Sequence, residues 1–496
     1  MSERLSPRDL AFLTAETPTA PRHNATVEIF EPGDSGFGYD RFRDLIGDRI
    51  ALVPRFRQRL LDVPGHLTTP RWVDDPHFDL GYHIRRSALP RPGTDAQLRE
   101  LVGRIVSRPL DRTRPLWEVY VVEGLAGDRL AVLSKTHQAL VDGVHTVDLG
   151  QLLLDLSPEP RELEPDDWSP RRAPSPLIVA AGGAKEVLTS RTAAVDTAAM
   201  ATAAARRRMR ESRARVGAVA SALTGRRPST GSAVGGPLSQ HRRIVTLETA
   251  LADYRTVRAA HGGTVNDVIL ATITGGVRAW LMTRSESLGG LRTVKVVVPV
   301  SVIDEEREAT SLGSQIAPHV VRLPVAEPSP VVRLHQVSYS FQAHQETGRS
   351  VAANRLAGIA GFAPATFHAI GARVAFEEVR RGYHLSVTNV PGPQAPLYAA
   401  GARMVATYPV PPLVEHHPIA VGVTSYDGKV FYGLTADRDQ IPDADVLASC
   451  LRESLDELLD SANPTTRSRA PRGRRRPARR TEAADAPAGQ QAGQES

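Results

Sequence analysis

At 496 residues the chain is long enough for two hydrophobic cores, and its single cysteine, Cys450, excludes an intramolecular disulfide and a cysteine metal cluster. The formal net charge of +6 is concentrated after residue 462, where eight arginines stand against three acidic residues, so the rest of the chain is nearly neutral. No run approaches the roughly 18 consecutive apolar residues that span a bilayer, and no apolar signal segment follows Met1, so we expect a cytoplasmic protein.

The first segment, 1–158, has the patterns of a mixed α/β unit. Strands are predicted at 26–30, 117–123 and 130–135, and a helix at 96–105. A further helix is predicted over 144–156, where apolar residues recur from Val144 to Leu156 with the period of one buried helix face.

The segment 159–240 is interpreted as a crossover linker. Its Pro-rich ends flank an Ala- and Arg-rich stretch, 177–223, that predicts a long helix. This helix could pack on the protein, which we favour, or lie on a membrane as a basic amphipathic helix. The basic segment 463–496 lacks large apolar residues and is predicted to be disordered, either as a solubilising tail or as a weak ligand of anionic lipid or nucleic acid.

The segment 241–462 is predicted to form a second α/β unit. Strands are expected at 244–247, 294–300, 385–390, 419–425 and 429–436, the last two joined by an Asp427-Gly428 turn. Helices are expected around Asn266 to Ala271 and, with a buried face from Val446 to Leu458, around Cys450.

One motif stands between a strand and a helix, and it reads His137-Gln138-Ala139-Leu140-Val141-Asp142-Gly143. It resembles the His-His-x-x-x-Asp-Gly element of the bacterial wax ester synthase/diacylglycerol acyltransferase family. Five further blocks occur in the family's order: Leu5-Ser6-Pro7 with Glu16-Thr17-Pro18, Pro115-Leu116-Trp117-Glu118, Asn266-Asp267, Thr388 to Pro393, and Ser425 to Gly428.

The resemblance implies an α/β (α+β) fold of two chloramphenicol acetyltransferase-like or condensation-domain-like halves around a central tunnel. It also implies transfer of a fatty acyl group from acyl-CoA to diacylglycerol or a long-chain alcohol, without a metal or cofactor. Such an enzyme is expected at the inner face of the membrane or at lipid droplets, with no specific nucleic-acid partner. Because acyl-CoA is amphipathic, the tunnel must pair an apolar wall with a basic mouth.

By the resemblance, the general base is the second histidine of the motif, and this position holds Gln138. An alcohol attacks a thioester well only when a base removes its proton, and an amide does not take up a proton near neutral pH. Gln138 could still orient the acceptor or stabilise the oxyanion. His137 or His145 could replace the base, although strand alternation turns His137 away from the face that Gln138 occupies.

The remaining site residues have structural explanations beside the functional ones. Asp142 is expected to hold the loop through an arginine or to cap the helix, and Gly143 to allow a tight turn. Pro115, Leu116 and Trp117 are assigned to the substrate site, with Trp117 as a core or tunnel-wall aromatic. Asn266 and Asp267 are assigned there too, although they could simply cap a helix.

Three hypotheses follow from the sequence. The first is an active acyltransferase that is slow or uses a relocated base. The second is a catalytically impaired relative that binds acyl-CoA or neutral lipid. The third is a condensation-type module, against which stand the Pro-Leu-Trp and Asn-Asp blocks and the lack of a carrier segment.

Overall fold

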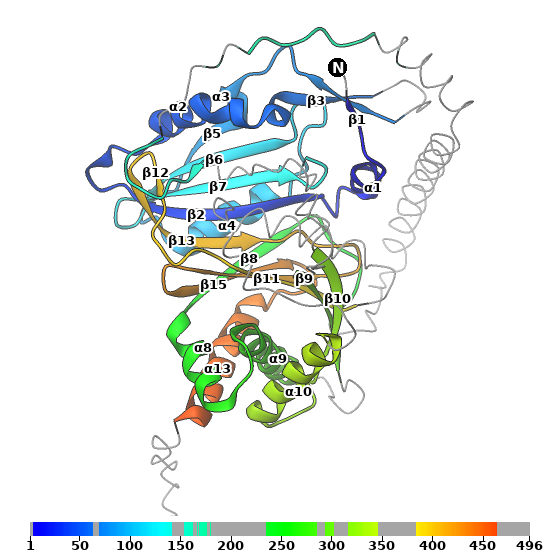
Figure 1. Ribbon diagram of the computed structural model, residues 1–496, viewed down its shortest axis with the longest axis vertical. Coiled ribbons are helices and arrows are strands. Elements are labelled where there is room, and N and C mark those ends of the chain that lie inside the picture. Colours follow the sequence, from blue (N-terminus) through cyan, green and yellow to red (C-terminus); the bar gives the residue numbers. More distant parts are fainter. Residues whose placement is uncertain are drawn as a thin grey trace, which may run out of the picture.

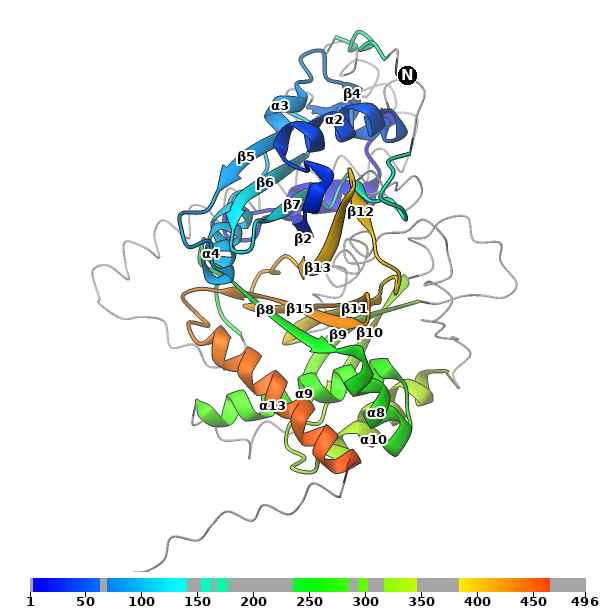
Figure 2. The ribbon, with the colours of Figure 1, turned by 90° about the vertical axis from the view of Figure 1, so that its left-hand side faces the viewer.

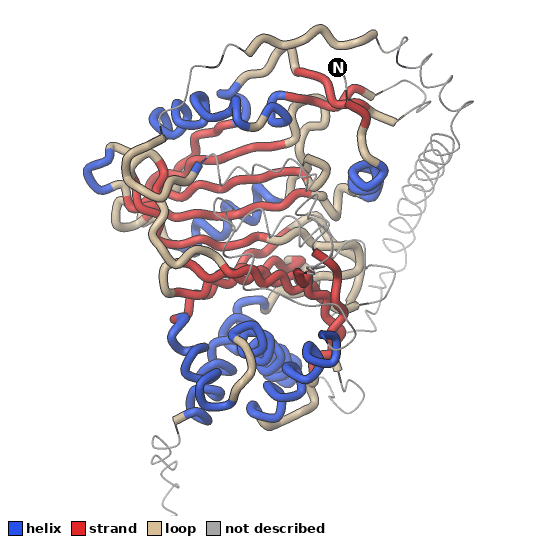
Figure 3. Tube along the Cα trace, viewed as in Figure 1, coloured by secondary structure: helices blue, strands red, loops and turns tan. Residues whose placement is uncertain are grey.

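The computed structural model describes residues 3–62, 69–140, 153–161, 166, 168–175, 179, 235–284, 293–301, 316–345 and 383–463. The described chain forms two halves, each built on a six-stranded sheet and each with its own hydrophobic core. The two sheets follow one another along the long axis of the molecule (Figures 1 and 3). Two cores agree with the expectation from chain length.

The first sheet has the strand order β12-β13-β2-β7-β6-β5. Its strands are β12 (Tyr398–Ala399), β13 (Ala402–Val410), β2 (His23–Glu31), β7 (Arg129–His137), β6 (Trp117–Leu125) and β5 (Ile84–Ala88). Neighbours are antiparallel except for β5 and β6. The three predicted strands of this half are confirmed as parts of β2, β6 and β7, each extended by a few residues.

The helices of the first half include the predicted one, α4 (Asp95–Val106), which begins with a capping box between Thr94 and Gln97. The others are α1 (Pro7–Ala15), α2 (Tyr39–Arg49) and the single turn α3 (Leu80–His83). A small sheet of order β1-β4-β3 completes this half, with β1 (Glu3–Arg4), β4 (Arg71–Asp74) and β3 (Gln58–Leu61).

The second sheet has the order β10-β9-β11-β14-β15-β8. Its strands are β10 (Ile316–Leu323), β9 (Val294–Ser301), β11 (Leu385–Pro391), β14 (Ile419–Tyr426), β15 (Lys429–Asp437) and β8 (Arg242–Ala250). Four helices gather on the side of this sheet away from the first half (Figure 2): α8 (Leu251–His261), α9 (Val265–Thr283), α10 (Pro330–Gln345) and α13 (Ala444–Ala462). The predicted strands and helices of this half are all confirmed, and positive φ angles at Asp427 (45°) and Gly428 (78°) make the predicted hairpin turn.

The second half contributes a strand pair to the first sheet, and the sequence pattern does not reveal this arrangement. Residues 398–410 follow β11 in the chain, yet β13 pairs with β2 of the first sheet. It also packs on β14 and β15, where Pro409 lies against the cross-strand pair Gly422 and Gly433. A Cβ at Gly433 would overlap the carbonyl oxygen of Pro409, so the seam between the halves depends on glycine there.

Two sequence expectations about buried faces are wrong. Leu156 is 80 % exposed in a bend, so the helix predicted over 144–156 does not extend to its last expected core residue. Val446 is 41 % exposed on α13, whereas Cys450 lies in the core. The linker helix predicted over 177–223 lies outside the described residues apart from Val179, and the predicted disordered tail lies outside them from residue 464 onward.

Candidate active site

The motif begins at the end of β7, where the chain leaves the first sheet. The backbone N–H of His137 donates to the carbonyl of Leu116 at 3.0 Å, and that of Gln138 donates to the carbonyl of Arg22 at 2.8 Å. The N–H of Leu140 then donates to the carbonyl of His137 at 2.9 Å, which closes a turn. The structure therefore brings the Pro-Leu-Trp block and the start of the histidine motif together through the backbone.

The His137 side chain is 1 % exposed and both of its ring nitrogens face other groups. Nδ1 accepts the backbone N–H of Ala139 at 3.0 Å, so this nitrogen carries a lone pair and the proton of the neutral ring is on Nε2. Nε2 faces Oε2 of Glu16 at 3.7 Å. Burial lowers the pKa of His137 despite Glu16, and the ring is neutral. His137 in this arrangement has no free lone pair with which to act as a base.

Glu16 ties four segments of the first half together. Its Oε2 accepts two hydrogen bonds from Arg112, at 3.1 Å from Nε and 2.5 Å from Nη2, and its Oε1 accepts the N–H of Arg22 at 3.0 Å. Burial by itself would raise the pKa of Glu16, but His137, Arg112 and the Arg22 N–H outweigh it and hold the pKa far below its usual value. The sequence showed Glu16 only as part of an opening block and gave no sign of this contact.

Arg22 brings a buried positive charge to the site. Burial lowers the pKa of its guanidinium to about 10, so it stays charged at neutral pH, and Tyr383, Glu16 and Glu415 favour the charge. Tyr383 and Glu415 belong to the second half, and the Tyr383 ring stacks on His417 at 4.0 Å between centroids. The site is therefore built from both halves, and no sequence motif marked these residues.

Gln138 is 1 % exposed and follows the last residue of β7. Its amide does not titrate near neutral pH, so the position expected to hold the base holds a hydrogen-bonding group instead. Asp142, Gly143 and His145 lie outside the described residues, as does the arginine partner expected for Asp142. Their assignments stay predictions.

Trp117 lies in the core of the first half. It is wholly buried, its Nε1 donates to the carbonyl of Phe56 at 2.7 Å, and its ring stacks on His83 with centroids 4.6 Å apart. Pro115 and Leu116 are buried beside it. These contacts agree with the expectation of a core or wall aromatic, while the substrate-binding assignment of the block stays a prediction.

The Asn-Asp block meets a later block across the second half. Nδ2 of Asn389, on β11, donates to Oδ1 of Asn266 at 2.8 Å. Asp267 forms a capping box with Thr264 at the start of α9 and accepts a hydrogen bond from Ser338 Oγ at 3.1 Å. The asparagine pair lies near the end of β11, whereas Tyr383 precedes the start of that strand. No described hydrogen bond joins the asparagine pair to Gln138.

Known proteins are similar to this chain in sequence. Residues 5–269 match the family model described as the wax ester synthase/diacylglycerol acyltransferase catalytic domain, and residues 312–459 match the WS/DGAT C-terminal domain. A "probable diacylglycerol O-acyltransferase" of Mycobacterium tuberculosis is 34 % identical over 422 residues, covering 85 % of this chain and 88 % of its own. Another from the same species is 36 % identical over 265 residues, 53 % of this chain and 97 % of its own.

Solved structures share the fold. The first condensation domain of the CDA synthetase superposes with a TM-score of 0.52 at 14 % identity, covering 93 % of this chain and 97 % of its own. The wax ester synthase/diacylglycerol acyltransferase from Marinobacter aquaeolei VT8 superposes with a TM-score of 0.62 at 24 % identity, covering 92 % and 99 %. The fold is thus the two-sheet α/β architecture of the condensation-domain class. Within that class, the chain belongs to the wax ester synthase/diacylglycerol acyltransferase family.

The described part of the chain contains no helix that is both long and apolar enough to cross a membrane. It also contains no group of three or more His, Cys, Asp or Glu side chains placed to hold a metal ion.

Proposed function

We propose that this protein transfers a fatty acyl group from acyl-CoA to the hydroxyl of diacylglycerol, a long-chain alcohol, or both. Family membership and the names of the mycobacterial relatives support the substrate class. The observation that carries the proposal is the anchored motif at the end of β7, where the Gln138 N–H donates to Arg22, whose buried guanidinium interacts with Tyr383 and Glu415 of the second half.

The reaction constrains what each group does. The acceptor oxygen attacks the thioester carbonyl, a C–O bond forms, the C–S bond breaks, and the hydroxyl proton ends on the leaving thiol. Gln138 can donate to the developing oxyanion or hold the acceptor hydroxyl, but it cannot take the proton. We infer that Asp142 and Gly143 shape the loop that carries it, and that the blocks at Pro115 to Trp117 and at Asn266 and Asp267 shape the substrate site.

The test of activity is CoA release. Purified protein is incubated with palmitoyl-CoA and either diolein or hexadecanol, and free thiol and ester product are measured against a heat-inactivated sample. Ester formation with release of one CoA per ester supports the proposal. Binding of palmitoyl-CoA without ester in either assay supports the impaired relative instead.

Gln138→His tests the position itself. A general base typically contributes about 10²–10⁴-fold, so restoring histidine should raise turnover by at least about tenfold. Gln138→Leu is the matched control, because it keeps the bulk and removes both the amide and any base. If histidine lowers turnover to the level of leucine, the amide has a role that an imidazole does not fill, and the proposed loss of a base is refuted.

We further propose that the protein works at the inner face of the membrane or at lipid droplets, because both acceptors are insoluble in water. The test is flotation with vesicles containing dioleoylglycerol, with and without anionic lipid. Protein that stays at the bottom of the gradient with every vesicle would contradict this placement.

A further inference from the structure

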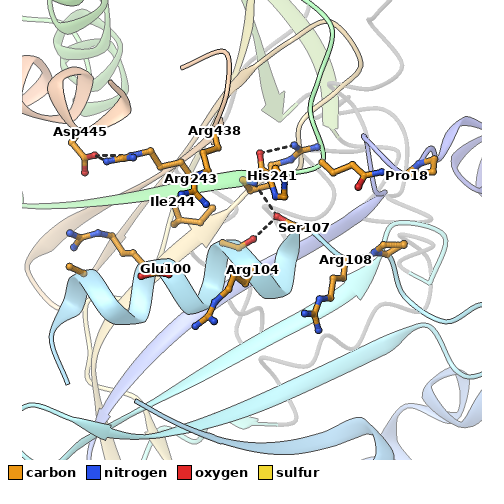
Figure 4. Close-up of a pocket in the computed structure, with 16 residues that line it drawn as sticks. Pro18, Glu100, Arg104, Ser107, Arg108, His241, Arg243, Ile244, Arg438 and Asp445 are labelled. Carbon is orange, nitrogen blue, oxygen red and sulfur yellow. Dashed lines mark hydrogen bonds and ion pairs between the residues drawn. The ribbon is translucent and has the colours of Figure 1, made fainter. Parts of the chain in front are cut away.

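A cavity of about 820 Å³ opens where α4 of the first half meets the start of β8 of the second (Figure 4). We call it the basic cavity. Six arginines line it: Arg99, Arg104 and Arg108 from α4 and the residues just after it, and Arg242, Arg243 and Arg438 from the second half. The carboxylates that line it are those of Glu100 and Asp445.

Most of this positive charge is uncompensated within the described residues. Arg243 forms an ion pair with Asp445, and Arg242 lies 3.4 Å from Asp437. The other four guanidinium groups, three of them exposed, form no ion pair with a described carboxylate: Arg99, Arg104, Arg108 and Arg438. Because the chain outside its tail is nearly neutral, this accumulation is local and does not reflect a generally basic surface.

Hydrogen bonds to the carbonyls at the C-terminal end of α4 favour the binding of a negatively charged ligand there. A helix C-terminus carries partial negative charge on its free carbonyls, which would repel an anion. Here Nζ of Lys135 donates to the carbonyl of Arg108 at 2.6 Å, and Nε2 of His23 bonds that of Val106 at 3.0 Å. Ser107 Oγ donates to the carbonyl of Gly103 at 2.6 Å. These contacts satisfy the carbonyls of Gly103, Val106 and Arg108, while Arg104 and Arg108 line the cavity with their side chains.

The same contacts place the basic cavity next to the candidate active site. Lys135 lies two residues before His137 on β7, and His23 is the cross-strand partner of His137 on β2. On the other side of the cavity, Nη2 of Arg242 donates to the carbonyl of Thr19, in the loop between Glu16 and Arg22. Hydrogen bonds therefore tie the end of α4 and Arg242, which border the basic cavity, to the strands and loop that carry His137 and Glu16.

We propose that the basic cavity binds the phosphate groups of the CoA nucleotide, an inference that rests on the proposed function. Guanidinium groups bind phosphate oxygens through paired hydrogen bonds, and CoA offers a diphosphate and a 3′-phosphate. Arginines from two halves converge on one opening, which suits a ligand with phosphates at two positions. The basic cavity is then the mouth through which the pantetheine thioester is led toward Gln138.

The experiment measures CoA binding by calorimetry, without turnover. Arg104→Gln with Arg108→Gln is compared with the wild type and with a control, Arg255→Gln with Arg258→Gln, which removes two exposed arginines of α8. Charge-assisted bonds at a partly exposed site predict a loss of roughly threefold to tenfold in affinity per arginine, and a weaker dependence on salt. The control should keep the wild-type affinity.

Ligand series separate the sources of phosphate. CoA should bind more tightly than 3′-dephospho-CoA, and inorganic phosphate should compete only at high concentration. Unchanged CoA affinity in the Arg104/Arg108 variant would overturn the proposal, as would an equal loss in the control. Loss of binding to phosphatidic acid vesicles with CoA binding intact would also overturn it. Because no turnover is needed, a protein that binds CoA here yet forms no ester would refute the proposed function alone.

Discussion

Glu16→Gln is expected to destabilise the protein by about 2–3 kcal/mol at pH 7. The carboxylate accepts two hydrogen bonds from Arg112 and one from the Arg22 N–H, and its side chain is 6 % exposed. Glutamine can keep bonds to one oxygen, but its NH₂ then faces a donor, so at least one charge-assisted bond of about 1.5–3 kcal/mol is lost. Breaking a buried pair costs about 3–5 kcal/mol, and the 35 % exposure of Arg112 places this one below that range.

The pH dependence gives a second measurement of the same group. The pKa of Glu16 is depressed in the folded state, so its contribution is fully present above the unfolded pKa of about 4.3 and is lost as pH falls toward the folded pKa. Urea unfolding at several pH values should show a constant difference between wild type and Glu16→Gln above about pH 5.5. Below about pH 4.3 the difference should shrink.

The control is Glu3→Gln, which removes an exposed carboxylate paired with Arg55. Surface pairs contribute about 0–1 kcal/mol, so this variant should unfold almost as the wild type does. A Glu16→Gln protein within about 0.5 kcal/mol of wild type at pH 7 would show that the Glu16 contacts do not hold the site together. A difference that stays constant down to pH 3 would show that the pKa of Glu16 is not perturbed.

Two further predictions concern the seam and the core. Gly433→Ala should destabilise the protein by about 1–3 kcal/mol in urea unfolding, because its Cβ would overlap the Pro409 carbonyl. Gly47→Ala in α2, where the nearest neighbour lies at 3.5 Å, should be neutral or stabilising. Equal effects of the two changes would refute the claim that the seam between the halves depends on glycine at 433. Trp117→Phe should cost about 2–3 kcal/mol in urea unfolding, since it removes the bond to Phe56 and leaves a void. Trp168→Phe, which weakens a cation–π contact with Arg57 and an edge contact with Phe78, should cost under about 1 kcal/mol.

The sequence predicted eight strands and the helices α4, α9 and α13 because each carries a local signal, whereas β10, β13 and the helices α1, α2, α8 and α10 were not predicted. Alternating or continuous apolar runs marked the strands, and 3.6-residue periodicity marked α4 and α13. The pairing of β13 with the first sheet has no such signal. The pattern of β13 is that of any buried strand, and its partner β2 lies about 370 residues away in the chain. The packing of Pro409 on the two glycines supports this placement, and the sequence pattern does not show that contact.

The candidate site was predicted where a motif is contiguous and missed where contacts are long-range. Gln138 and His137 could be named from the motif, and strand alternation alone already argued against His137 as a base. The structure adds a different reason, since the two nitrogens of His137 face Ala139 and Glu16. Arg22 and Tyr383 come from opposite halves and share no spacing with the motif, so no pattern could join them.

The exchange of a base for an amide at residue 138 is compatible with an intact fold for a physical reason. The motif is held by backbone bonds to Leu116 and Arg22 and by the buried Glu16 network. We therefore expect Gln138→His to change turnover while leaving CoA affinity unchanged, which separates the chemical step from substrate binding.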